Sequence, residues 1–159
     1  MKASTQLANR FREVIHGKWI ANTNLTEQLE NVSLETAITQ VHGLNTIAML
    51  TFHIHYYIAG VLNVLEGGEL TIRDKYSFDL PPMNEEEEWE SLKNQLIQNA
   101  DKFAEQVELL PDKKLDDIFV NKNYGDYRRN IDGIIEHTYY HLGQITLVKK
   151  LLEESKKSH

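Results

Sequence analysis

A stretch of thirty residues without any charged side chain, from Thr36 to Leu65, constrains the fold of this chain more than any other feature. Its length is sufficient for a helix that spans a bilayer. We nevertheless interpret it as the central helix of a soluble bundle and expect no membrane partner, because it lacks basic flanking residues. It also contains six polar side chains that are costly to place in lipid: Gln40, His42, Asn45, His53, His55 and Asn63.

Apolar residues recur every three or four positions in four segments, which indicates four helices. The expected helices cover about residues 5–15, 33–65, 84–110 and 127–154. The second would be roughly 45–50 Å long at about 1.5 Å per residue, unless Gly43 or Gly60 kinks or shortens it. Capping boxes at 24–27 and 84–87 predict a short helical turn through Leu29 and the start of the third long helix.

Glycine and proline residues mark the ends of the expected helices at Gly17, Gly67 and Pro111. Residues 67–83 then form a long loop or an extended excursion. Four long helices with such connections pack most simply as a four-helix bundle. The predicted fold is therefore all-α, a four-helix bundle with long loop connections, in a single domain that covers residues 1–159.

The composition narrows the classes of site and partner. Hydrophobic residues make up 41% of the chain and charged residues 26%, which is typical of a globular protein. The chain has no cysteine, which excludes disulfides and thiolate metal sites. Its formal net charge of −7 disfavours nucleic acid as a partner. The N-terminal residues show no signal-peptide pattern, so a cytoplasmic location is expected.

Two histidines on the last helix, His137 and His141, form the first candidate site. They are four residues apart, so about 40° separates them around the helix axis and both imidazoles can reach one ion. They lie at the edge of the apolar stripe that includes Ile134 and Leu142. The spacing alone is a weak indication, because such pairs are common and no Glu follows the first histidine as in metalloprotease helices. The alternative is two histidines with ordinary hydrogen bonds at the edge of the core.

A third histidine, His53, lies in the middle of the charge-free stretch and is expected to be buried, where it needs a partner. A nitrogen ligand from this helix would complete a three-histidine site with open positions for water or substrate. The other four histidines are interpreted as structural or surface residues: His16, His42, His55 and His159.

The stretch from Gly43 to Leu50 leading into His53, together with the motif at 136–145 (EHTYYHLGQI), resembles the DinB-like (YfiT-like) superfamily, which is named after bacterial DNA-damage-inducible proteins. The similarity extends from Trp19 to Leu152. It implies a four-helix bundle, often dimeric, that holds a divalent metal ion. Carried over to this chain, the ligands are His53, His137 and His141, and the register of the looser first motif favours His53 over His55.

The metal implied by the resemblance is nickel, zinc, iron or manganese, because imidazole suits several of these ions. Near the ligands, Gln144 is expected to orient a water or an imidazole, or else only to pack against Gly143. Tyr57 is a weak catalytic candidate, and its alternative is a plain core residue. Asp132 and Glu136 point away from the histidines, so no acidic residue is obviously placed as a general base.

Three functions are compatible with these residues. In the first, the chain is a hydrolase that activates water on the metal. In the second, it is an enzyme that activates a low-molecular-weight thiol and transfers it, as some members of the resembled superfamily do. The alternative is a non-catalytic metal-binding or stress-response protein. The expected partner is a small-molecule substrate, with a thiol as one candidate. A second copy of the chain is expected to cover the apolar surface of the second helix.

Overall fold

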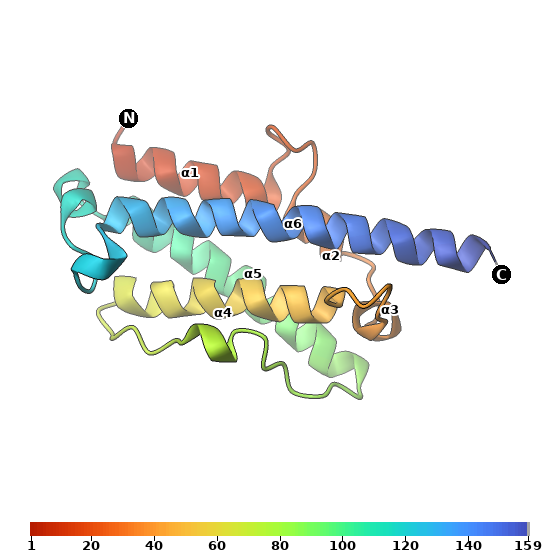
Figure 1. Cartoon of the computed structure of the whole chain (residues 1–159). Helices are drawn as coiled ribbons and strands as arrows, with labels where there is room; N and C mark the ends of the chain where they lie inside the picture. The colour runs from red at the N-terminus through yellow and green to blue at the C-terminus, as the bar shows by residue number, and fades with distance from the viewer. Residues whose placement is uncertain (159) are drawn as a thin grey trace.

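The computed structural model describes residues 1–158, and it confirms that the fold is all-α (Figure 1). Among these residues there is no β-strand, and an isolated antiparallel bridge joins Ile118 and Asp126. The α-helices are α1 Ala3–His16, α2 Leu25–Leu29, α3 Leu34–Ile38, α4 Ile47–Leu65, α5 Glu86–Leu109 and α6 Tyr127–Lys157. Short 3-10 helices follow α4 at η1 Asp74–Tyr76 and follow α5 at η2 Asp112–Asp116 and η3 Lys122–Tyr124.

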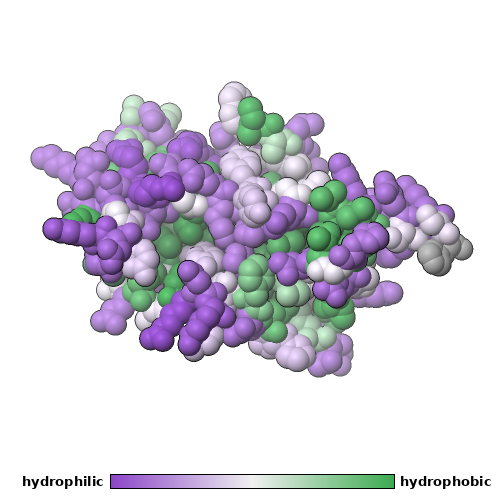
Figure 2. Space-filling model, viewed as in Figure 1, coloured by the Kyte–Doolittle hydropathy of each residue, from purple (hydrophilic) through white to green (hydrophobic). Residues whose placement is uncertain are grey.

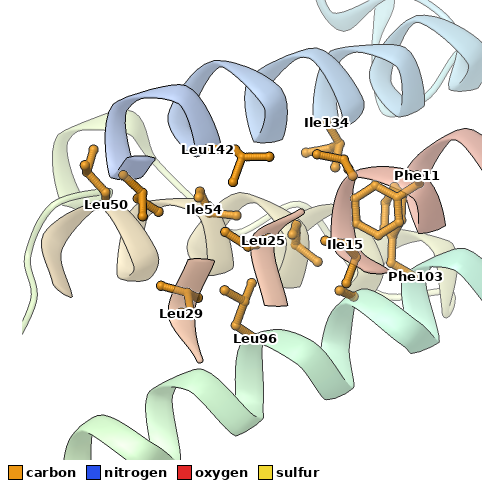
Figure 3. Close-up of a cluster of buried hydrophobic side chains, with 14 of the residues drawn as sticks. Phe11, Ile15, Leu25, Leu29, Leu50, Ile54, Leu96, Phe103, Ile134 and Leu142 are labelled. Carbon is orange, nitrogen blue, oxygen red and sulfur yellow. The ribbon is translucent and has the colours of Figure 1, made fainter. Parts of the chain in front are cut away.

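The four long helices enclose one apolar core. Both α5 and α6 pack against α1 and α4, so buried side chains from all four helices meet in the centre (Figure 3). The rings of Phe11 from α1 and Phe103 from α5 have centroids 4.6 Å apart. Ile54 of α4 and Leu142 of α6 are also buried in this core. Each such side chain contributes about 1.5–3 kcal/mol by leaving water, and this packing holds α4 and α6 side by side.

The single helix predicted over 33–65 is wrong, and of the two glycines named as able to shorten it, Gly43 lies at the break between α3 and α4. His42 and Gly43 adopt positive φ angles of 49° and 71°, which no α-helix contains. The side chain of Thr46 then caps α4 by accepting a hydrogen bond of 3.1 Å from the Met49 backbone N–H. The helix that carries His53 is therefore 19 residues long, and His42 lies in the exposed turn before it.

The predicted helix ends are otherwise close to those observed. Asn24 caps α2 by accepting from the Glu27 N–H at 2.8 Å. The capping box of α5 joins Glu85 and Glu88, one residue later than the pattern predicted. The acidic residues that follow stabilise this helix start, because they face the positive end of the helix dipole.

Residues 67–83, called the strap below, run along the outer side of α4 (Figure 1). Gly60 permits this close approach, since a Cβ atom there would lie 2.5 Å from Cδ1 of Ile72. The hydroxyl of Tyr56 donates to the Arg73 carbonyl at 3.0 Å and accepts from the Arg73 N–H at 2.8 Å. The strap is thereby fixed to α4 by both packing and hydrogen bonds.

The strap leaves less of the α4 surface exposed than the sequence led us to expect. Of the residues Ile47–Leu65, all within the described part of the chain, only Asn63 is exposed. This helix is long and apolar enough to cross a membrane by length and composition, but 56% of its most apolar window is buried inside the protein. The surface that a second subunit was expected to cover is thus covered by the chain itself.

Candidate metal centre

Three histidine side chains converge where α4 faces α6. The Nε2 atom of His137 lies 3.0 Å from Nε2 of His53 and 3.0 Å from Nε2 of His141. His53 and His141 are buried, and His137 is half-buried. The structure therefore brings together the three residues that the sequence predicted, and their nitrogen atoms form a group that could hold a metal ion.

Hydrogen bonds on the far side of two rings decide which nitrogen faces the centre. The Nδ1 of His53 donates to the Ser77 carbonyl oxygen at 3.1 Å, and Nδ1 of His141 donates to Oε1 of Gln144 at 2.6 Å. A neutral imidazole that donates from Nδ1 carries its lone pair on Nε2. Both rings are thus held with an acceptor nitrogen toward His137, as is usual for metal-bound histidines.

The spacing of these nitrogens fits a divalent ion. Two imidazole nitrogens that bind one ion at about 2.1 Å and at a right angle are about 3.0 Å apart, which is the separation of two of the three pairs. All three nitrogens lie within 4.8 Å of one another. Without a cation, Nε2 of a neutral His137 can carry a proton and donate it to a neighbouring Nε2 at this distance; a bound ion would replace that proton. Three neutral nitrogen donors suit zinc, nickel, iron or manganese.

The environment keeps the three imidazoles uncharged at neutral pH. Burial, together with repulsion from His141 and His53, lowers the pKa of His137 to about 4. Burial also lowers the pKa of His53, although the Ser77 carbonyl opposes this shift. The pKa of His141 is lowered by burial and raised by Gln144, with a net decrease. Protons therefore compete weakly for the nitrogens that face the centre.

Aromatic side chains enclose the group of histidines. The ring of Phe78, from the strap, stacks on His53 with centroids 3.9 Å apart and planes 9° apart. Tyr57 presents its edge at 5.1 Å from His53 and 4.9 Å from His137, and Tyr140 lies 5.0 Å from His141. These contacts limit the rotation of the imidazoles and reduce their exposure to water.

The remaining described histidines lie outside this group. The Nε2 of His55 lies 2.8 Å from Nδ2 of Asn99 on α5, so His55 faces the opposite side of α4 and does not replace His53. His16 contacts Asp101 at 2.7 Å and Thr26 at 3.2 Å. His159 lies outside the described residues.

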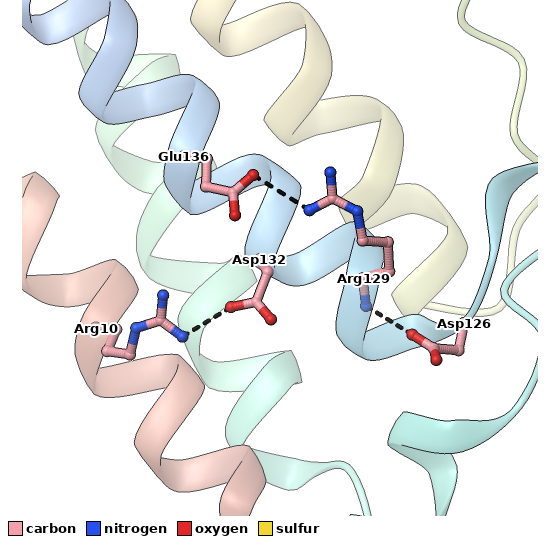
Figure 4. A network of polar contacts seen from close by, with 5 residues as sticks. All are labelled: Arg10, Asp126, Arg129, Asp132 and Glu136. Carbon is pink, nitrogen blue, oxygen red and sulfur yellow. Dashed lines mark hydrogen bonds and ion pairs between the residues drawn. The ribbon is translucent and has the colours of Figure 1, made fainter.

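The carboxylates of α6 point away from the centre, as predicted. Asp132 pairs with Arg10 of α1 at 2.7 Å, and Glu136 pairs with Arg129 at 3.2 Å (Figure 4). A different carboxylate, which was not among the predicted residues, is Asp74 of the strap, whose Oδ1 accepts a hydrogen bond of 2.8 Å from the hydroxyl of Tyr57. No periodic pattern marks this residue in the sequence, because it lies in an irregular segment.

A cavity of about 380 Å³ adjoins the histidines, bounded by α4, the strap, the connection before α6 and the first turns of α6. In Figure 2, apolar atoms are visible in a recess between polar ones over this region. Its apolar lining consists of Val61, Leu70, Ile72, Phe119, Gly133 and Ile134. Its polar lining consists of Tyr57, Asp74, Asn123, Tyr124, Arg129, Asn130 and His137.

A family model described as the DinB superfamily matches residues 20–145, which is well over half of the chain. The match includes all three converging histidines. No curated protein and no solved structure matches the chain.

Proposed function

The chain belongs to the DinB superfamily, and from this premise we propose that it is a metal-dependent enzyme acting on a small molecule. In this proposal one divalent ion is held by Nε2 of His53, His137 and His141. The observation that carries it is the convergence of these three nitrogens. Hydrogen bonds from Nδ1, on the far side of the ring, orient two of the imidazoles. We also take the four long helices to be the four-helix bundle that the family resemblance implies.

The donor set favours a catalytic over a structural ion. Structural zinc sites usually have four protein ligands, whereas catalytic sites keep an open position. Three neutral imidazoles also leave the double charge of the ion uncompensated, which attracts an anion. The alternative of a non-catalytic metal-binding protein has less support, because the group found among the described residues has three members rather than the four that are usual for a structural ion.

When bound, the ion supplies a Lewis acid that lowers the pKa of a water or a thiol. The side chain of Gln144 and the carbonyl of Ser77 keep two imidazoles oriented during this step. Asp74 is the one carboxylate in the cavity lining, and its contact with Tyr57 places it beside the histidines. Its oxygens can accept the proton that the nucleophile loses.

Two nucleophiles are consistent with this arrangement, which makes the enzyme a hydrolase or a transferase of a low-molecular-weight thiol. Asp74 supports activation of water, since it provides the base that the sequence did not show. The uncompensated charge at the three histidines equally supports formation of a thiolate. A cytoplasmic location and a homodimer remain predictions from the sequence.

The direct test is the metal content of protein purified without a metal-affinity column, measured by mass spectrometry. We expect about one equivalent in the wild type and none in the His137→Ala/His141→Ala double variant. The matched control is His42→Asn, because His42 is exposed in a turn with positive φ that Asn tolerates. Absence of bound metal in the wild type, even after incubation with nickel, zinc, iron and manganese, would overturn the proposal.

A further inference from the structure

The cavity beside the histidines extends along one face of α6, from His137 at one end to Arg129 at the other. These two residues are eight positions apart, so their Cα atoms are separated by about 12 Å along the helix axis. Gly133 lies midway between them, and nothing lies within 4 Å of a Cβ atom built there. The cavity is therefore elongated and open at its middle.

The two ends of the cavity differ chemically. Arg129 is the single cation in its lining, and one of its nitrogens contacts Glu136 at 3.2 Å (Figure 4). Both partners of that ion pair are largely exposed, so the pair contributes little and exchanges readily. A guanidinium has five N–H donors, and most of those of Arg129 remain available for a ligand.

Two more polar side chains lie near the Arg129 end of the cavity. The side chains of Asn123 and Tyr124 line the cavity, and neither has a hydrogen-bond partner within residues 1–158. An amide and a phenol hydroxyl both donate hydrogen bonds, and with a guanidinium they suit the oxygens of a carboxylate. Between this end and His137 the walls are apolar, with Val61, Ile72 and Ile134 facing the space.

The geometry points to a small carboxylate with an apolar body as the substrate class of this site, which rests on the proposed function. The carboxylate binds Arg129 with Asn123 and Tyr124, the apolar body lies over Gly133, and the reacting group reaches the histidines. Arg129 is in this view the residue that determines specificity, since it selects anions over neutral molecules of the same shape.

The test uses metal-free protein, so that a carboxylate cannot bind through an ion. The probe is 4-phenylbutyrate, and its neutral counterpart is 4-phenylbutan-1-ol, each titrated into ¹⁵N-labelled protein and followed by NMR. We expect the acid to bind with shifts centred on the Gly133 and Arg129 amides, and about tenfold more tightly than the alcohol. Arg129→Gln should abolish that preference, and Gly133→Leu should block both probes by filling the space.

Each variant has a matched control on the same helix. Arg128→Gln removes a neighbouring cation that pairs with Asp116 outside the cavity. Gly143→Leu adds the same side chain at another open glycine of α6 that is not in the lining. Both controls should bind the acid as the wild type does.

Equal binding of acid and alcohol, an equal effect of Arg128→Gln and Arg129→Gln, or no binding of either probe would overturn the inference. These outcomes are independent of the metal measurement, because the protein contains no metal in this experiment. If the wild type binds metal but does not prefer the acid over the alcohol, only the proposed substrate class is refuted.

Discussion

His53 and His137 face each other with their Nε2 atoms 3.0 Å apart, although they are 84 positions apart in the chain. Each residue lies on a long helix whose position is determined by the shared core, so the distance reflects the packing of α4 against α6. The site therefore depends on residues that never contact a metal, and several predictions concern them.

Substitution of Gln144 should weaken metal binding. Its Oε1 holds Nδ1 of His141 at 2.6 Å, and removal of such a partner reduces metal affinity by about 10- to 100-fold. We expect this loss for Gln144→Ala and recovery for Gln144→Glu, which restores an acceptor. Isothermal titration with zinc measures it, and an unchanged affinity in Gln144→Ala would show that Gln144 only packs.

Substitution of Gly60 should disturb the site from a distance. A Cβ atom there meets the Ile72 side chain at 2.5 Å, so Gly60→Val should displace the strap and cost about 1–3 kcal/mol of stability. Because the strap carries Ser77 and Phe78, which hold His53, zinc affinity should fall as well. Gly143→Val is the control, since its Cβ meets open space; equal zinc affinity in the two variants would contradict the prediction.

The stability of the metal-free protein should fall in mild acid. The pKa of His137 is about 4 in the folded protein and 6.5 in the unfolded chain, so the unfolded state binds more protons between these values. Stability is therefore complete above about pH 6.5 and decreases towards pH 4, by on the order of 2 kcal/mol after allowance for partial exposure. Urea unfolding of the wild type and of His137→Gln measures this difference, and parallel pH profiles would refute it.

Loss of the Asp74 carboxylate should slow chemistry without removing the ion. In any hydrolysis or thiol-transfer reaction that a substrate screen identifies, we expect Asp74→Asn to lower kcat by about 10²- to 10⁴-fold. Metal content should stay at the wild-type level, because Asp74 does not belong to the group of three histidines. Asp79→Asn, in the same strap but outside the cavity lining, should retain full activity. An unchanged kcat in Asp74→Asn would remove this residue from the mechanism.

If the predicted homodimer forms, the structure indicates a surface for it other than α4. Tyr140 and Leu147 of α6 are 66% and 55% exposed, and Leu44, which lines a shared pocket with Leu147, is 41% exposed. Leu147→Glu should then yield a monomer in analytical ultracentrifugation while metal binding persists, because a buried charge in an interface is costly. A wild type that sediments only as a monomer at tens of micromolar would refute the dimer itself.

Much of the fold was accessible from the sequence because helices are encoded locally. The apolar spacing of α1, α5 and α6 lies within each segment, and the caps at Gly17 of α1 and Asn24 of α2 are short-range contacts. The pairing of His137 with His141 follows from helix geometry in the same way. Gly43 was named from the sequence as a residue that could shorten the second helix. The complete break there was not predicted, because it depends on two consecutive residues, His42 and Gly43, in left-handed conformation.

By itself, the sequence determined an all-α chain without thiolate ligands and with two histidines on one face of its last helix. Only the tertiary structure decided that His53 rather than His55 joins them, since the two residues face opposite sides of α4. It alone also placed Ser77, Phe78 and Asp74 beside the histidines. The physical reason is that the strap has no periodicity of its own, so its side chains acquire their positions only by packing and hydrogen bonding to α4.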